Sequence, residues 1–138
     1  MAFIDWNDSY NTYIPDMDQQ HQGLVRLINQ LHESIEAGHD REAVGGVIRS
    51  LVDYTIFHFR EEESLMCQFA PSMHEHHSAF HAAFAEWISD QLVKWGMGEE
   101  VEAGYLLEYL RWWLLDHIAC EDVAMARAIM KVPAAILK

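Results

Sequence analysis

The stretch "HQGLVRLINQLHESIEAGHD", residues 21–40, is the part of the sequence that best indicates the fold. Its apolar residues recur three or four positions apart, at Leu24, Leu27, Ile28, Leu31 and Ile35. This rhythm is typical of an amphipathic helix and differs from the strict alternation of a strand. We expect the helix to begin after Asp16 or Asp18, which can cap it, and to end at Gly38.

Three more stretches repeat this pattern. Asp40 can cap a second helix, which Pro71 ends; a third begins within 72–76 and runs to the "WGMG" turn at 95–98, and a fourth covers about 99–129. Short connections between four such helices predict an all-α, antiparallel up-down-up-down four-helix bundle. We expect a single domain over residues 1–138, with residues 1–17 as a non-helical N-terminal arm.

Composition narrows the class of protein. The chain has 138 residues, the size of one ordinary domain, and a formal net charge of −13, which repels nucleic acid and anionic membranes. No apolar run approaches the roughly 20 residues of a membrane span, and the start "MAFIDWNDSY" does not resemble a secretory signal. We expect a cytoplasmic protein, with Cys67 and Cys120 as buried free thiols.

Histidine is unusually frequent, with nine residues against nine lysines and arginines together. His58 and Glu62 lie four residues apart, as do His77 and His81, so each pair shares a helix face. With about 1.5 Å of rise per residue, these pairs and the candidates on the other two helices lie roughly 24–38 Å from the turns at one end of the bundle. The candidates at this level are His21, His58, Glu62, His77, His81, His117 and Asp122.

A single histidine on an apolar face is most often a core residue that is hydrogen-bonded within the protein. That interpretation does not account for five histidines and two carboxylates at one level of four helices. The set is too large for one tetrahedral zinc ion and suits two octahedral iron-type ions bridged by carboxylates. Zinc-protease and ferritin-like patterns do not fit, because position 78 is Ser and the one Glu-x-x-His motif, Glu36 to His39, lies at a helix end.

The motif "HIACED", residues 117–122, leaves one choice open. In a regular helix, four residues turn about 400° and five turn about 500°. Helical geometry alone therefore favours Glu121 over Asp122 as the partner of His117.

The chain resembles the hemerythrin family, in particular single-domain bacterial hemerythrins, over nearly its whole length. The resemblance rests on "DWNDSY", "MDQQHQGLVRLINQL", "HFREEESLM", "HSAFHAAF" and "WLLDHIACED". It implies two iron ions per chain, one held by His77, His81 and His117 and the other by His21 and His58. Glu62 and Asp122 would bridge the two ions together with an oxo or hydroxo group.

The resemblance thus selects Asp122 over Glu121. This requires either that His117 and Asp122 approach from opposite flanks of the helix or that the helix is widened there, as in a π-bulge. The other histidines, His32, His39, His74 and His76, match no ligand position and are expected to be exposed or weakly structural.

The function implied by the resemblance is reversible binding of dioxygen for storage, delivery or scavenging, without enzymatic turnover. Its oxygen pocket needs apolar walls, for which the candidates are Trp113, Leu114, Phe59 and Ile118. The alternatives are an oxygen or redox sensor that acts on a partner, and a di-iron enzyme that reduces peroxide or nitric oxide or oxidises iron. We expect a monomer or a weak homo-oligomer.

Overall fold

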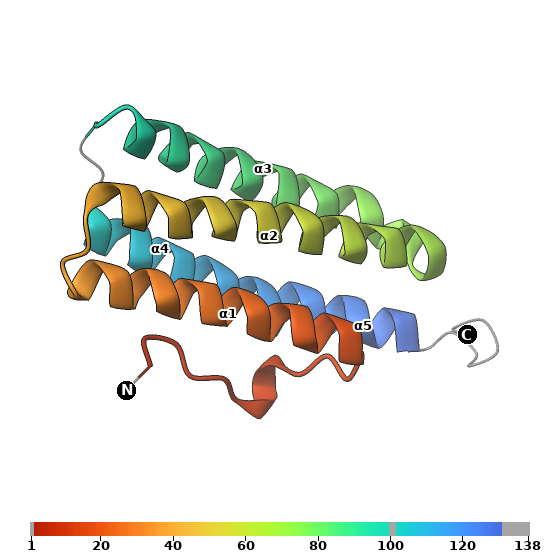
Figure 1. Cartoon of the computed structure of the whole chain (residues 1–138). Coiled ribbons are helices and arrows are strands. Elements are labelled where there is room, and N and C mark those ends of the chain that lie inside the picture. Colours follow the sequence, from red (N-terminus) through yellow and green to blue (C-terminus); the bar gives the residue numbers. More distant parts are fainter. Residues whose placement is uncertain (1, 100–101, 131–138) are drawn as a thin grey trace.

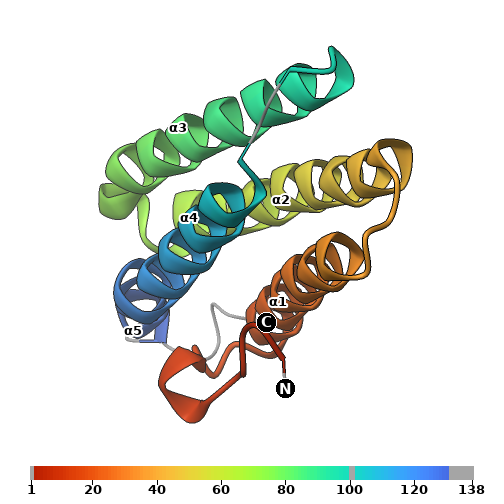
Figure 2. The same cartoon turned by 90° about the vertical axis from the view of Figure 1, so that its left-hand side faces the viewer.

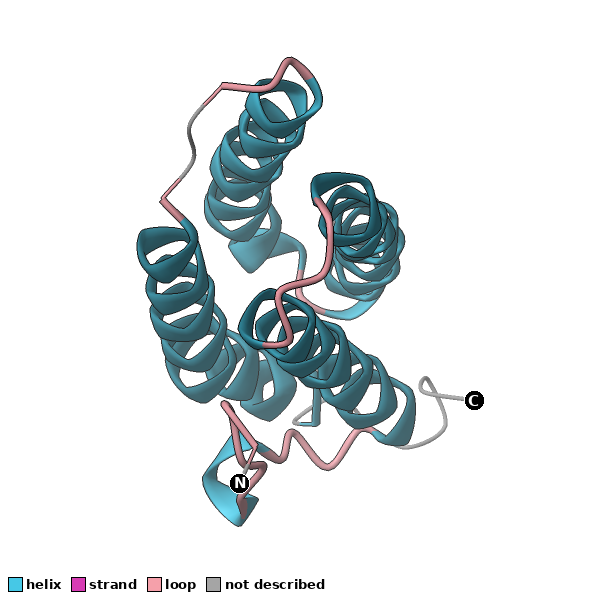
Figure 3. Cartoon of the chain, turned by 60° about the vertical axis from the view of Figure 1, so that its left-hand side comes forward, coloured by secondary structure: helices cyan, strands magenta, loops and turns pink. Residues whose placement is uncertain are grey.

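The computed structural model describes residues 2–99 and 102–130 and shows a bundle of four antiparallel helical rods (Figures 1 and 2). Three rods are the single helices α1 (Pro15–Glu36), α2 (Arg41–Phe69) and α3 (Pro71–Gly96). The fourth runs without a break through α4 (Ala103–Asp116), η2 (His117–Asp122) and α5 (Val123–Met130). The predicted all-α four-helix architecture is confirmed, and the described residues contain no strand (Figure 3).

Local sequence signals set the ends of the first two helices. α1 starts with Pro15, and its N-cap is Ile14, two or four positions before the predicted caps Asp16 and Asp18, which fall inside the first turn. It closes through Gly38, whose φ of 71° lies in the left-handed region that glycine adopts at little cost. The Asp40 side chain accepts a hydrogen bond from the Ala43 amide at 2.8 Å, so the predicted cap of α2 is confirmed.

The connections of α3 differ from the prediction at both ends. A single residue, Ala70, joins α2 to α3, and α3 begins directly at Pro71, not within residues 72–76. Proline is well suited to a first helical position because it has no amide hydrogen to donate. α4 begins at Ala103, not near Glu99, because the Glu102 side chain accepts the backbone amides of Gly104 and Tyr105.

Leu24, Ile28 and Leu31 of the predicted stripe on α1 are buried in the core, and Leu27 and Ile35 are partly buried against it. Gly23 lets α1 approach α2 closely, because a Cβ atom at this position would collide with the Tyr54 side chain. Both cysteines lie outside the core. Cys67 and Cys120 are exposed, so their predicted burial is wrong, since each falls on the outer face of its helix. None of the described helices is long and apolar enough to cross a membrane.

The N-terminal arm packs along the bundle and contains one short helical turn, η1 (Asp8–Tyr10). The arm ends at residue 14, not 17. Asn29 of α1 accepts the Ile4 amide at 2.7 Å and donates to the Ile4 carbonyl at 3.0 Å. The Asp18 carboxylate accepts the amides of Thr12 and Tyr13, which lets Tyr13 adopt a left-handed φ of 64°. The arm is therefore held in place along α1.

Candidate metal centre

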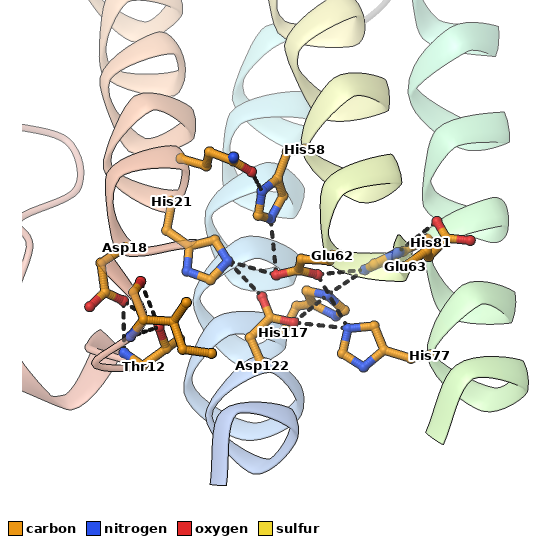
Figure 4. Close-up of polar contacts among 12 residues, drawn as sticks. Thr12, Asp18, His21, His58, Glu62, Glu63, His77, His81, His117 and Asp122 are labelled. Carbon is orange, nitrogen blue, oxygen red and sulfur yellow. Dashed lines mark hydrogen bonds and ion pairs between the residues drawn. The ribbon is translucent and has the colours of Figure 1, made fainter. Parts of the chain in front are cut away.

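The fold brings all seven predicted ligand residues into one buried cluster inside the bundle (Figure 4). Every rod contributes at least one of them: His21 from α1, His58 and Glu62 from α2, His77 and His81 from α3, and His117 and Asp122 from η2. The prediction that these side chains meet at one level is confirmed. Their potential ligand atoms form two groups that share Glu62 and Asp122, with the atoms of each group within 4.8 Å of one another.

The Glu62 carboxylate divides its two oxygens between the two groups. Oε1 lies 2.9 Å from His21 Nε2 and 3.1 Å from His58 Nε2. Oε2 lies 3.1 Å from His81 Nε2 and 3.4 Å from His77 Nε2. One carboxylate therefore faces two separate sets of imidazole nitrogens.

Asp122 divides its oxygens in the same way. Oδ2 lies 2.9 Å from His21 Nε2, whereas Oδ1 lies 2.9 Å from His77 Nε2 and 3.0 Å from His117 Nε2. Two histidines thus share one pair of carboxylate oxygens, and three histidines share the other pair. This is the donor arrangement that two carboxylate-bridged metal ions require.

The spacings and the unpaired atoms both fit metal ions. With metal–nitrogen bonds of about 2.1 Å, neighbouring ligands of an octahedron lie about 3.0 Å apart. The Nε2 atoms of His81 and His117 face each other at 3.1 Å. Five buried atoms of the ligand residues make no hydrogen bond among the described residues, and three of them face the other ligands: His58 Nε2, Glu62 Oε2 and Asp122 Oδ2. Since buried polar atoms are normally satisfied, these three atoms fit a bound cation.

Charges within the cluster shift several pKa values. Burial by itself lowers the pKa of His21, but the carboxylates of Asp122 and Glu62 outweigh it and raise that pKa to about 10. Burial likewise opposes the shift at His77, where the same two carboxylates raise the pKa to about 9. Against the effect of their own burial, the neighbouring histidines hold the pKa values of both carboxyl groups well below the usual range. Without metal, His21 and His77 are therefore protonated at neutral pH, and their protons lie where metal ions would bind.

The segment "HIACED" is a π-helix, which brings Asp122 and not Glu121 into the cluster beside His117. A π-turn closes hydrogen bonds five residues apart instead of four, so a residue five positions on returns to the same face. Asp122 is fully buried in the cluster, whereas the Glu121 side chain is 31% exposed and lies 4.0 Å from the exposed His76. The widened backbone is the π-bulge that we proposed as one way to reconcile geometry with the resemblance.

Two polar residues outside the predicted set contact the outer ring nitrogens of the histidines. His58 Nδ1 lies 2.8 Å from Gln20 Oε1, and His81 Nδ1 lies 3.2 Å from Glu63 Oε2. Sequence reasoning missed both contacts. Gln20 and Glu63 directly neighbour predicted ligands in the chain, but neighbours on a helix point about 100° apart, so no spacing rule marks them.

Only two of the four residues predicted to form the pocket wall line the same cavity. Trp113 and Leu114 line a small apolar cavity one helical turn from the cluster, with room for about one water-sized molecule. Phe59 and Ile118 are buried but do not line it; Phe59 stacks on the His81 ring at a centroid distance of 3.8 Å. Trp113 also stacks on the His117 ring, at 4.5 Å. The cavity is completed by Leu24, Ile28, Leu51, Thr55, Phe84 and Leu110.

The remaining histidines lie away from the cluster. His39 and His76 are exposed, and His32 and His74 are half-buried. His32 stacks on Phe3 of the arm, and His39 contacts the Ser34 hydroxyl at 2.9 Å. These positions agree with the expectation of exposed or weakly structural roles.

Comparison with known proteins places the chain in a family. The profile of the Hemerythrin HHE cation binding domain matches residues 12–129, and the chain belongs to this hemerythrin family. It is 36% identical to bacteriohemerythrin of Pseudomonas aeruginosa over 94% of this chain and 83% of that protein. It is 28% identical to bacteriohemerythrin of Methylococcus capsulatus, over 88% and 93% of the two chains.

The fold comparison agrees with the family assignment. A crystal structure of wild-type hemerythrin matches with a TM-score of 0.87 and 26% sequence identity, covering 93% of this chain and 98% of that chain. The chain is therefore a hemerythrin-type protein with a cluster of histidines and carboxylates that can bind metal.

Proposed function

We propose that this protein binds dioxygen reversibly at a pair of iron ions held by the seven clustered residues. The observation that carries the proposal is the division of both carboxylates, Glu62 and Asp122, between a set of two histidines and a set of three. Mixed nitrogen and oxygen donors of this kind suit iron. The match to the Hemerythrin HHE cation binding domain supports a metal site in this chain.

The donor set would leave one position free. With a shared oxo or hydroxo bridge and the two carboxylates, His77, His81 and His117 would give one iron six ligands. His21 and His58 with the same bridges would give the other iron five. The iron pair, when bound, would supply the electrons for dioxygen binding, and the vacant position on the two-histidine side is where we expect it to bind.

The surrounding residues favour binding over turnover. The cavity one helical turn from the cluster is lined by apolar side chains and Thr55, whose hydroxyl donates to the Leu51 carbonyl at 2.7 Å. Since that proton is already used within α2, the cavity offers no free general acid or base. An enzyme that reduces peroxide would need such a group. We therefore propose a carrier, scavenger or store of oxygen, and not an enzyme.

A sensor role is the second candidate, supported by the arm. The turn η1 packs against η2, the segment that carries His117 and Asp122. A change in the positions of these two side chains can therefore reach the N-terminal arm directly. A pull-down whose captured partner depends on the oxygen or redox state would support this role.

The decisive experiment is anaerobic loading with ferrous iron, followed by aeration while the absorption spectrum is recorded. We expect two irons per chain and a visible band that appears with dioxygen and bleaches when dioxygen is removed. The proposal would be refuted if the absorption spectrum of the iron-loaded protein did not change when oxygen is added. Continued oxygen consumption with added reductant would favour the enzyme alternative.

A further inference from the structure

The two sets of histidines differ in the charge of the groups behind them. With metal on the Nε2 atoms of His58 and His81, each ring would carry its proton on Nδ1 and donate it outward. His58 Nδ1 lies against the neutral amide oxygen of Gln20, whereas His81 Nδ1 lies against the carboxylate of Glu63. A negative charge thus lies behind His81 of the three-histidine set (Figure 4), and a neutral amide lies behind His58 of the two-histidine set.

The Glu63 contact is placed to act on the metal electronically. The His81 ring is buried, and stacking on Phe59 at 3.8 Å fixes its plane. Glu63 is 29% exposed, and no lysine or arginine of the described part of the chain pairs with it. Arg60 lines the same surface groove as Glu63 but forms no ion pair with it. A carboxylate that accepts the outer proton of a histidine ligand makes the ligating nitrogen more basic.

A more basic nitrogen favours the more highly charged metal ion. We propose that Glu63 is a positioning residue which, acting through His81, makes the three-histidine iron the first of the pair to be oxidised. Gln20 leaves the two-histidine iron, with its open position, in the ferrous state. A one-electron oxidant such as ferricyanide would therefore take its electron from the three-histidine iron. The mixed-valence protein would then hold a ferric ion in the three-histidine set and a ferrous ion in the two-histidine set. This inference rests on the proposed di-iron site.

The test is an anaerobic redox titration of the iron-loaded protein, with Mössbauer spectra of the mixed-valence form. Glu63→Gln should raise the potential of the first oxidation and lower ferrous affinity by at most about 10–100-fold, the usual range for such outer partners. Glu63→Asp, which retains the charge, should restore much of the potential. The double exchange Gln20→Glu with Glu63→Gln should move the ferric ion to the two-histidine set.

Glu61→Gln is the matched control, because it removes the same charge from an exposed neighbour on α2 that makes no ion pair among the described residues. If Glu63→Gln shifts the potential no more than Glu61→Gln, the proposal is wrong. A loss of iron affinity at unchanged potential also overturns it, because Glu63 would then only hold the His81 ring in place.

Failure of the proposed function would look different. The potentials are measured without oxygen, so a protein that loads two irons but shows no oxygen-dependent band would refute oxygen binding and leave the role of Glu63 testable. A chain that does not hold two irons would overturn both proposals.

Discussion

Helix α2 and segment η2 each deliver one histidine and one carboxylate to the same cluster, but with different spacing. α2 is a regular α-helix and places Glu62 four residues after His58. η2 is a π-helix and places Asp122 five residues after His117. Both carboxylates end fully buried, each with its oxygens divided between the two histidine sets.

The difference shows that ligand spacing has meaning only together with the local winding of the helix. Four residues complete about one turn of an α-helix, whereas a π-turn takes up one more residue in the same arc. The chain uses the longer glutamate where the helix is regular and the shorter aspartate where it is widened. A fixed His-x-x-x-acid rule finds the first pair and selects the wrong acid in the second.

Removing the carboxylates should have the largest effect, and it tests the comparison directly. Asp122→Ala and Glu62→Ala should each abolish binding of the metal pair, because each residue faces both histidine sets. Metal content per chain after loading and desalting measures the loss.

Each carboxylate has an acidic neighbour one residue before it that serves as a control. Glu121→Ala and Glu61→Ala remove the same charge from side chains outside the cluster, and both variants should keep two metals. Loss of the pair in Glu121→Ala, with Asp122→Ala unaffected, would contradict the assignment of η2.

Substitution of the aromatic rings that stack on the cluster histidines should have the next largest effect. Phe59 of α2 is 4% exposed and stacks on His81, whereas Trp113, just before η2, is only half-buried where it stacks on His117. Phe59→Ala should lower the free energy of unfolding by about 3–5 kcal/mol, as is usual for a buried phenylalanine. Urea unfolding of the metal-free protein should show a smaller loss of unfolding free energy for Trp113→Ala than for Phe59→Ala. Equal losses would mean that the exposure of the ring does not decide how much it stabilises the protein.

Metal binding should release protons, because His21 and His77 each contact both carboxylates. Their pKa values, raised to about 10 and about 9, keep both rings protonated at neutral pH without metal. Loading should then release about two protons per chain near pH 7, measured by calorimetry in buffers of different ionisation enthalpy. Release that stays the same in a His21→Gln variant would argue against this pairing.

The same shifts give the metal-free protein a pH dependence with a definite sign. The pKa of each of these histidines is raised on folding from an ordinary value of 6.5. Their contribution to stability is therefore fully present below about pH 6.5 and is lost as the pH rises through about 9 to 10. Thermal unfolding across this range should show a falling midpoint.

The smallest expected effect is a difference in backbone opening between the two segments. π-turns are rare and interrupt the regular ladder, so amides of η2 should exchange with solvent faster than those around His58 in the metal-free protein. Metal should protect η2 more than α2, because it fixes His117 and Asp122 together. Hydrogen exchange with mass spectrometry measures this; equal protection would show that the π-helix is as rigid as its α-helical counterpart.

Much of the fold was predictable because its signals are local. The apolar stripes, the Asp40 cap and Gly38 each act within a few residues, so they could be recognised from the chain alone. The helix starts at Pro15, Pro71 and Ala103 were misplaced by a few residues, since competing caps lie close together in the sequence. Cys67 and Cys120 were wrongly expected in the core, because residue type is a weaker guide to burial than helix phase.

The sequence by itself determined which histidines and acids could meet, because spacing and rise along a helix place side chains on a face and at a level. Only the tertiary structure decided that Asp122 and not Glu121 enters the cluster, since that depends on how η2 is wound. It alone paired His81 with Glu63 and His58 with Gln20, because these contacts join different helices. Periodicity along one chain segment carries no information about which neighbouring helix supplies the partner of an outward-facing nitrogen.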